Sequence, residues 1–370
     1  MFHNALNRRS FFRLCELLLV VSLVTLPAAG QLPARLTDQE FWKLASDYSE
    51  PDGVFHSENL VSNELRFQTV IPALIKAAVP GRAYVGVGSE QNFTYIAATK
   101  PAMVFIVDIR RGNLDLHLLY KALFELSANR AEFVGKLFAR SKPAGLSETS
   151  TAAEIFAAYA SVPPSQALYD QNLKDIKNHL LTKHGFALST GDQGGIDFVY
   201  SSWFRSGPGI AYQLNGANGG RGGTNLGTPS YADLMRADDG QGTNRSYLAT
   251  EASFKFIKDL HTRNLIVPVV GNFGGPKALR AVGAYLKEKK AVVSTFYTSN
   301  VEQYLRQDRI WENFCRSVST FPLDATSTFI RSERGGFPGQ TPSIAAVPGA
   351  NFNSGLIPIQ NELTKCGGAR

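Results

Sequence analysis

The order of apolar and polar positions predicts strands and helices in alternation. Residues 81–95 and then 103–111 have the pattern of a strand, a glycine turn, a short helix, and a second strand that ends at an acidic residue. A second unit of this kind follows near the C-terminus, with strand 264–273, a helix to Lys290 and strand 291–296. Alternating strands and helices predict an α/β fold with a mostly parallel sheet, because parallel neighbours need a crossover connection.

Helical patterns fill most of the region between these two units. Apolar residues at helical spacing predict a long helix over 113–140, and 141–185 is mostly helical in pattern. Residues 191–200 have a strand-like pattern. The glycine-dense segment 207–227 predicts a mobile loop that could act as a lid, because it has too few apolar side chains to anchor a core.

The N-terminal residues 1–30 have the parts of a secretory signal: a basic start, an apolar run over 17–29 and small residues before Gln31. The pair Arg8-Arg9 also fits a twin-arginine export signal, and that alternative stays open. The apolar run is short for a membrane span. We expect a periplasmic or secreted protein with no stable membrane insertion after the signal is cleaved.

The mature sequence is long enough for one large domain. We assign it to residues 31–340, with a helical insertion around 141–245 and a loose C-terminal tail at 341–370. Outside the cytoplasm Cys315 and Cys366 could form one disulfide, a question that the sequence leaves open. Two cysteines without supporting histidine spacing do not make a metal site.

Charge and motifs exclude several classes of function. The chain has 38 Lys and Arg against 31 Asp and Glu, and the positive excess is spread along the sequence instead of clustered. We therefore expect no nucleic-acid partner. Neither a G-x-S-x-G elbow nor an H-E-x-x-H motif occurs, which makes a hydrolase the weakest enzyme class.

The candidate ligand-binding residues share positions at or just after predicted strand ends, where open α/β sheets bind small molecules. They are Gly86, Gly88, Glu90, Gln91, Asn92, Asp108, Arg110, Asn272 and Asn300. The glycines would let the backbone approach a ligand, and Asp108 is placed to accept hydrogen bonds from a ribose. The alternative is a plain tight turn, with Asp108 capping the next helix or pairing with Arg110 or Arg111. Asn63 and Glu64 either face this turn or belong to a helix cap.

Four motifs carry a resemblance to a known family. They are residues 86–95, 108–111 with 117–123, 267–273 with 275–277, and 296–302, within roughly 52–332. They resemble a family of functionally uncharacterised bacterial proteins whose fold is similar to that of S-adenosylmethionine-dependent methyltransferases. The resemblance implies a Rossmann-like sheet, with Gly86 and Gly88 lining the amino-acid portion of the cofactor and Asp108 its ribose. Asn272 stands where the family pattern has Asp.

A methyltransferase would use His117, Tyr297 or Glu302 to orient or deprotonate the methyl acceptor. His117 shares a helix face with Tyr120 and Lys121, and that face either points toward the strand ends or is solvated. Export weighs against methyl transfer, because S-adenosylmethionine is made and kept in the cytoplasm. The alternative function is a non-catalytic periplasmic protein that captures a small polar ligand in the same crevice.

Overall fold

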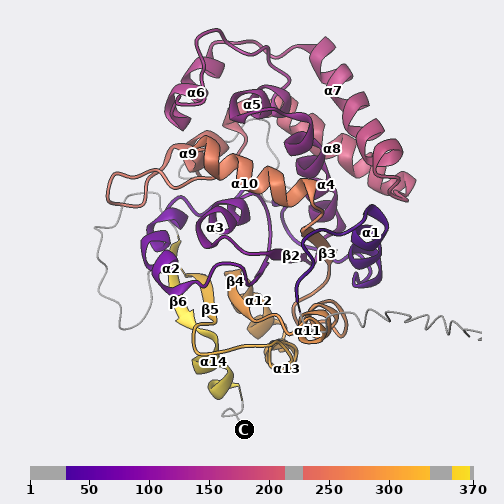
Figure 1. The fold of residues 1–370 in the computed structure, drawn as a ribbon, viewed down its shortest axis with the longest axis vertical. Coiled ribbons are helices and arrows are strands. Elements are labelled where there is room, and N and C mark those ends of the chain that lie inside the picture. The colour runs from indigo at the N-terminus through magenta and orange to yellow at the C-terminus, as the bar shows by residue number, and fades with distance from the viewer. Residues whose placement is uncertain (1–30, 213–227, 334–351, 367–370) are drawn as a thin grey trace, which may run out of the picture.

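A six-stranded sheet organises the protein, as the computed structural model shows for residues 31–212, 228–333 and 352–366 (Figure 1). Its strands lie in the order β3-β2-β1-β4-β5-β6. They are β1 (Ala83–Gly86), β2 (Met103–Asp108), β3 (Ile266–Val270), β4 (Val293–Ser299), β5 (Thr328–Glu333) and β6 (Asn353–Pro358). The first five are parallel neighbours, and β6 pairs antiparallel with β5. The predicted α/β class with a mostly parallel sheet is confirmed.

The strand sequences agree with their positions in this sheet. Every residue of β1, β2 and β3 is buried, and their continuous apolar runs are typical of parallel strands covered on both faces. Pro268 cannot donate a backbone hydrogen bond, and it is accommodated because β3 is an edge strand.

Helices cover the two faces of the sheet. In Figure 1 the helices between β2 and β3 lie above the sheet, and α11, α13 and α14 lie below it. The helices outside the long connection are α1 (Asp38–Asp47), α2 (Ile71–Ala77), α3 (Gln91–Thr99), α11 (Ala278–Glu288), α12 (Val301–Gln307), α13 (Trp311–Val318) and α14 (Ile359–Lys365), with the 3₁₀ turn η1 (Phe67–Val70). Thr37 and Glu40 form a capping box that starts α1.

The connection from β2 to β3 is a helical insertion. Its elements are α4 (Arg111–Leu126), α5 (Arg130–Leu137), α6 (Ala152–Ala160), α7 (Gln166–Asn178), the π-helix η2 (His179–Lys183), α8 (Thr190–Ser206), the 3₁₀ turn η3 (Gly207–Gly209), α9 (Tyr231–Arg236) and α10 (Glu251–Thr262). The single helix expected over 113–140 is two helices. Asn129 starts the second one, because its side chain accepts the backbone N–H of Glu132.

The strand expected over 191–200 is wrong, because this segment lies within α8. Ser189 and Asp192 form a capping box that starts the helix. The buried side chains then recur at helical spacing: Ile196, Val199, Tyr200 and Trp203. Gly195 lets α8 pack closely on α4, because a Cβ atom at this position would lie 2.0 Å from Oδ2 of Asp115.

Two further expectations concern the glycine-dense segment and the C-terminal tail. Within 207–227 the structure describes only residues up to 212, where η3 forms and Ala211 pairs with Ser230. Residues 352–366 of the segment expected to be a loose tail form β6 and α14. A disulfide joins Cys315 on α13 to Cys366 at the C-terminal end of α14. The pairing that the sequence left open is therefore present.

Some expectations fall outside what the structure describes. The predicted signal at residues 1–30 and the remainder of the glycine-dense segment, 213–227, belong to this group. Within 31–212, 228–333 and 352–366, no helix has both the length and the apolar character needed to cross a membrane.

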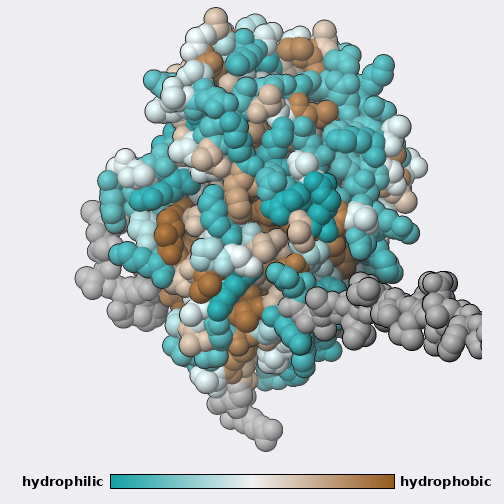
Figure 2. Space-filling model, viewed as in Figure 1, coloured by the Kyte–Doolittle hydropathy of each residue, from teal (hydrophilic) through white to brown (hydrophobic). Residues whose placement is uncertain are grey.

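One apolar core joins the sheet to the insertion. Phe93 on α3 contacts Tyr120 and Phe124 on α4 edge-on, with ring centroids 5.1 and 5.4 Å apart. Phe124 in turn stacks on Phe254 of α10. The insertion is therefore part of the same packed body as the sheet. On the face shown in Figure 2, hydrophobic side chains occur in small groups among polar ones.

Candidate functional site

A cavity of about 1120 Å³ lies at the carboxyl ends of the parallel strands. Gly88 follows β1, Asp108 ends β2, Asn272 follows β3 and Asn300 follows β4, and all four line the cavity. The sheet extends from β1 in two directions, toward β2 on one side and β4 on the other. Open α/β sheets bind ligands at such a change of direction, outside the carboxyl strand ends.

The structure brings most of the predicted site residues together. Those that line the cavity are Gly88, Gln91, Asp108, Arg110, Asn272, Tyr297 and Asn300. Those that lie outside its wall are Gly86, Glu90, Asn92, His117 and Glu302.

The glycine turn after β1 is shaped by Asn92. Its side-chain amide donates to the carbonyl oxygens of Val87 and Ser89, each at 2.8 Å, and its Oδ1 accepts from the Tyr84 hydroxyl at 2.9 Å. A Cβ atom at Gly86 would lie only 1.9 Å from that Oδ1 atom. Gly88 lines the cavity with a φ of +79°, and a Cβ atom added there would meet nothing within 4 Å. Asn92 and Gly86 thus set the turn from behind, and Gly88 faces the cavity.

Asp108 is a buried acid on the cavity wall. Its Oδ1 accepts the backbone N–H of Arg110 at 2.9 Å, and only 3% of the residue is exposed. Burial raises the pKa of Asp108 to about 6, although the Arg110 and Gly88 amides and the Arg110 charge favour the ionised form. Asp108 is therefore largely ionised at neutral pH and lies within reach of a ligand in the cavity.

Arg110 pairs with a neighbour other than Asp108. Its guanidinium forms an ion pair with Glu58 and donates to the carbonyl oxygen of Ser57 at 2.9 Å. Asn272 is similarly engaged, since its Oδ1 accepts the backbone N–H of Gly274 at 2.8 Å. These contacts hold both side chains in place along the wall.

Glu64 is a buried acid on the cavity wall that was not among the predicted ligand-binding residues. Its carboxylate accepts from the Gln91 amide at 2.7 Å and from the Tyr297 hydroxyl at 3.0 Å. The hydroxyls of Ser299 and Ser332 also donate to it. The sequence left open whether Glu64 faces the glycine turn or belongs to a helix cap. Glu64 faces α3, the helix after the turn, and η1 starts without a side-chain cap. Glu64 thus ties α3 to β4 and β5 and orients Tyr297.

His117 and Glu90 lie behind the glycine turn. Nε2 of His117 donates to the carbonyl oxygen of Gly88 at 2.9 Å, and burial lowers the pKa of His117 to about 4. Burial raises the pKa of Glu90 to about 7, and this carboxyl accepts the backbone N–H of Ser62 at 3.2 Å. At neutral pH His117 is therefore uncharged, and its ring makes a hydrogen bond within the protein instead of lining the cavity.

Glu302 belongs to a different polar cluster. It forms an ion pair with Arg331, which also contacts Glu362 at 3.0 Å. Burial raises the pKa of Glu302 to about 7 in spite of the Arg331 charge. This cluster joins α12, β5 and α14 and does not line the cavity.

An aromatic group on the cavity wall was not predicted from the sequence. The Nε2 atom of His56 lies 3.4 Å from the Tyr212 hydroxyl and 3.5 Å from the Tyr304 hydroxyl. Phe55 packs edge-on against Tyr304, with ring centroids 5.2 Å apart. Phe55 and His56 lie in the segment before η1, Tyr212 follows η3 and Tyr304 lies on α12, and these three segments share no sequence pattern. Only the adjacent pair Phe55-His56 could have drawn attention to them.

The fold and the cavity define an α/β protein with a cavity at the carboxyl ends of its parallel strands. The chain matches a family described as "Domain of unknown function (DUF7790)" over residues 59–184 and 228–361, and it belongs to this family. This agrees with the expected membership of an uncharacterised family. A comparison with curated proteins finds no match.

Proposed function

We propose that this protein binds a nucleoside-like small molecule in the strand-end cavity, with S-adenosylmethionine as the first candidate. The observation that carries the proposal is the Asp108 carboxylate at the end of β2, beside Gly88, on the wall of one cavity. An acid at this position accepts hydrogen bonds from ribose hydroxyls in doubly wound nucleotide-binding folds. The cavity volume of about 1120 Å³ exceeds what one drug-sized ligand needs.

The strand order supports a Rossmann-like, methyltransferase-like fold. Strands β3-β2-β1-β4-β5 follow the order of doubly wound nucleotide-binding sheets, and the antiparallel β6 adds an edge. The long insertion between β2 and β3 departs from the usual short crossover.

The residues on the wall fit the parts of such a ligand. Gly88 leaves room for the amino-acid portion, Asp108 would accept the ribose hydroxyls, and Gln91 and Asn300 offer polar groups nearby. When bound, S-adenosylmethionine supplies an activated methyl group. The protein's part is to hold and align the two reactants, and this requires no nucleophile. Tyr297 would orient the acceptor through its hydroxyl oxygen, because its O–H donates to Glu64 and the side chain is held on the cavity wall.

A second candidate is binding without catalysis. Two of the three candidate catalytic residues, His117 and Glu302, are engaged in contacts outside the cavity wall. A periplasmic or secreted protein that captures a small polar ligand needs the cavity but neither of these groups. The Cys315–Cys366 disulfide supports an oxidising compartment and therefore export.

Calorimetry with S-adenosylmethionine, S-adenosylhomocysteine and adenosine tests the proposal. We expect saturable binding of at least the two cofactor forms, with one site per chain. No heat and no thermal shift with any of the three at millimolar concentration would contradict nucleoside binding. Binding without turnover of any methyl acceptor would favour the second candidate.

A further inference from the structure

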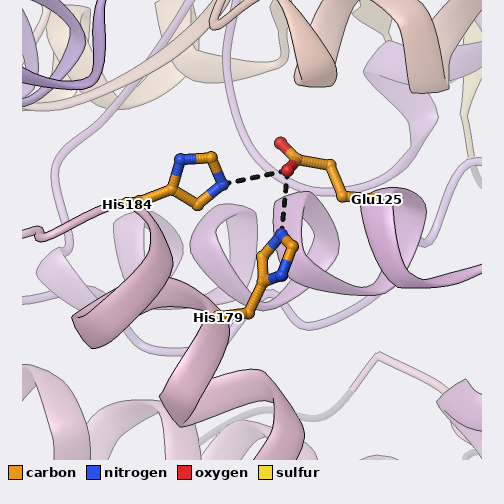
Figure 3. A group of neighbouring side chains, drawn as sticks. All are labelled: Glu125, His179 and His184. Carbon is orange, nitrogen blue, oxygen red and sulfur yellow. Dashed lines mark hydrogen bonds and ion pairs between the residues drawn. The ribbon is translucent and has the colours of Figure 1, made fainter.

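A second polar cluster lies in the helical insertion, away from the strand-end cavity. Glu125 on α4 faces His179 and His184, which stand at the two ends of the π-helix η2 (Figure 3). Oε2 of Glu125 lies 2.8 Å from Nε2 of His179 and 2.9 Å from Nε2 of His184. The three potential ligand atoms all lie within 4.8 Å of one another.

The π-helix is what makes the two imidazoles converge. In a regular α-helix, residues five apart point about 140° away from each other around the axis. Here the backbone N–H of His184 bonds to the carbonyl oxygen of His179 at 3.0 Å, which is the i to i+5 closure of a π-turn. Such turns are rare in proteins, and those that do occur are often found at functional sites. Figure 3 shows both rings directed at the same carboxylate oxygen.

Asp38 orients the second histidine from α1. Its Oδ1 lies 2.6 Å from Nδ1 of His184, so Nδ1 carries the proton that is donated to Asp38. In the neutral ring Nε2 then presents a bare lone pair to the Glu125 carboxylate. That contact is favourable only if a second proton or a cation lies between the two groups. A carboxylate that holds the far nitrogen of a histidine is the usual support of a metal ligand.

Lys121 occupies one carboxylate oxygen of Glu125 and leaves the other for a metal ion. Nζ of Lys121 contacts Oε1 of Glu125 at 2.7 Å and is also fixed by the carbonyl oxygen of His261 and by Asn264. Oε2 therefore faces the histidines. Lys183 lies 3.5 Å from Oε2, but 62% of its side chain is exposed, so it can move into solvent.

The His184 side of the cluster borders a hollow in the protein surface. His184 and Asp38 line a surface hollow of about 510 Å³ together with Trp42 and Ser46. Three ligands with an open fourth position form the usual arrangement of a zinc ion that keeps a bound water.

We propose that Glu125, His179 and His184 bind one divalent transition-metal ion of the zinc class, with Asp38 holding His184 in its ligating tautomer. Two imidazole nitrogens and one carboxylate oxygen are a donor set that zinc accepts. The ion would join α4 and η2 directly and α1 through Asp38. This proposal does not depend on the strand-end cavity, because the two sites share no lining residue.

The test is zinc binding to the full chain, purified without a polyhistidine tag and stripped with a chelator. We expect one zinc per chain by calorimetry and by elemental analysis, with a dissociation constant of about 1 µM or tighter. His179→Asn and His184→Asn should each abolish stoichiometric binding. Asp38→Asn should weaken it by about 10- to 100-fold, as loss of a supporting carboxylate does. His56→Asn, a histidine on the strand-end cavity, is the matched control and should bind as the wild type does.

Cobalt(II) provides a second measurement that keeps the test decisive if a ligand variant does not fold. The wild type with cobalt should show the intense visible bands of a four-coordinate site, and the partly exposed Asp38→Asn change should alter them. No zinc bound by the wild type would overturn the proposal. Equal affinities of wild type, His184→Asn and Asp38→Asn, or equal losses in the His56→Asn control, would overturn it as well.

Discussion

Nε2 of His117 donates a hydrogen bond of 2.9 Å to the carbonyl oxygen of Gly88, so the histidine supports the glycine turn from the side opposite the cavity. Burial lowers the pKa of His117 to about 4, and this residue serves the fold as a neutral group. The interaction positions Gly88 at the cavity, even though His117 does not line it.

His117 should make the protein sensitive to mild acid. The folded pKa of about 4 lies below the unfolded value of about 6.5, so the unfolded chain binds the proton more readily. The stability that neutral His117 contributes is present above about pH 6.5 and is lost as the pH falls toward 4. Urea unfolding at pH 7 and pH 4.5 should show a loss on the order of 2–3 kcal/mol that His117→Asn removes. The same loss in the variant would contradict this role.

Gly86 and Gly88 form a matched pair whose substitutions should destabilise the protein to different extents. Gly86→Ala places a Cβ atom against Asn92, so we expect the free energy of unfolding to fall by about 2–4 kcal/mol. The Cβ atom of Gly88→Ala would meet no neighbouring atom, so only the positive φ lowers the free energy of unfolding, by about 1–2 kcal/mol. Thermal unfolding and calorimetry should therefore show a large loss of stability at Gly86, and at Gly88 a small one together with weaker ligand binding. Equal effects at both positions would contradict the arrangement of the turn.

Asp115 should destabilise the protein increasingly as the pH rises from about 4 to about 8. Burial, together with the Asp192 charge, raises its pKa to about 8 against the opposing Arg111 charge. The folded chain therefore holds this proton more tightly than the unfolded chain, and stability is lost as the pH rises from about 4 to about 8. Asp115→Asn mimics the protonated acid, so its gain over the wild type should be greater at pH 8 than at pH 5, by on the order of 2–4 kcal/mol. A gain independent of pH would show that the acid is ionised throughout.

The disulfide should stabilise the C-terminal elements. It closes a sequence separation of 51 residues, for which chain-entropy arguments give about 4 kcal/mol. Cys366→Ser, or reduction of the wild type, should lower the free energy of unfolding by up to this amount. The double variant Cys315→Ser/Cys366→Ser is the control and should be insensitive to reductant. A wild type whose stability does not change on reduction would contradict the pairing.

The sequence predicted those parts of the fold that depend on local pattern. The buried runs of β1, β2 and β3 and the strand-end positions of Asp108 and Asn272 follow from apolar runs and the turns after them. The segment 191–200 was misassigned because its paired glycines resemble a turn before a strand. Its helical conformation is set by the Ser189 cap and by close packing on Asp115.

The rest of the site depends on contacts between segments far apart in the chain. Glu64 accepts from Gln91, Tyr297 and Ser332, and no local spacing brings these donors together. His117 has the helical position that was expected, but whether its ring enters the cavity or supports the turn is decided by packing. The convergence of His179 and His184 on Glu125 likewise needs a π-turn, which apolar periodicity does not predict.

Calorimetric titration of Asp108→Ala with S-adenosylmethionine tests the central claim most directly. If Asp108 accepts the ribose hydroxyls, loss of a charge-assisted hydrogen bond worth about 1.5–3 kcal/mol should weaken binding roughly tenfold to a hundredfold. Because the pKa of Asp108 is about 6, wild-type affinity should also rise between pH 5 and pH 7, and Asp108→Asn should not show that rise. If the wild type binds and Asp108→Ala binds equally well while losing stability, Asp108 only holds the Arg110 amide. That result would contradict a nucleoside site at the end of β2.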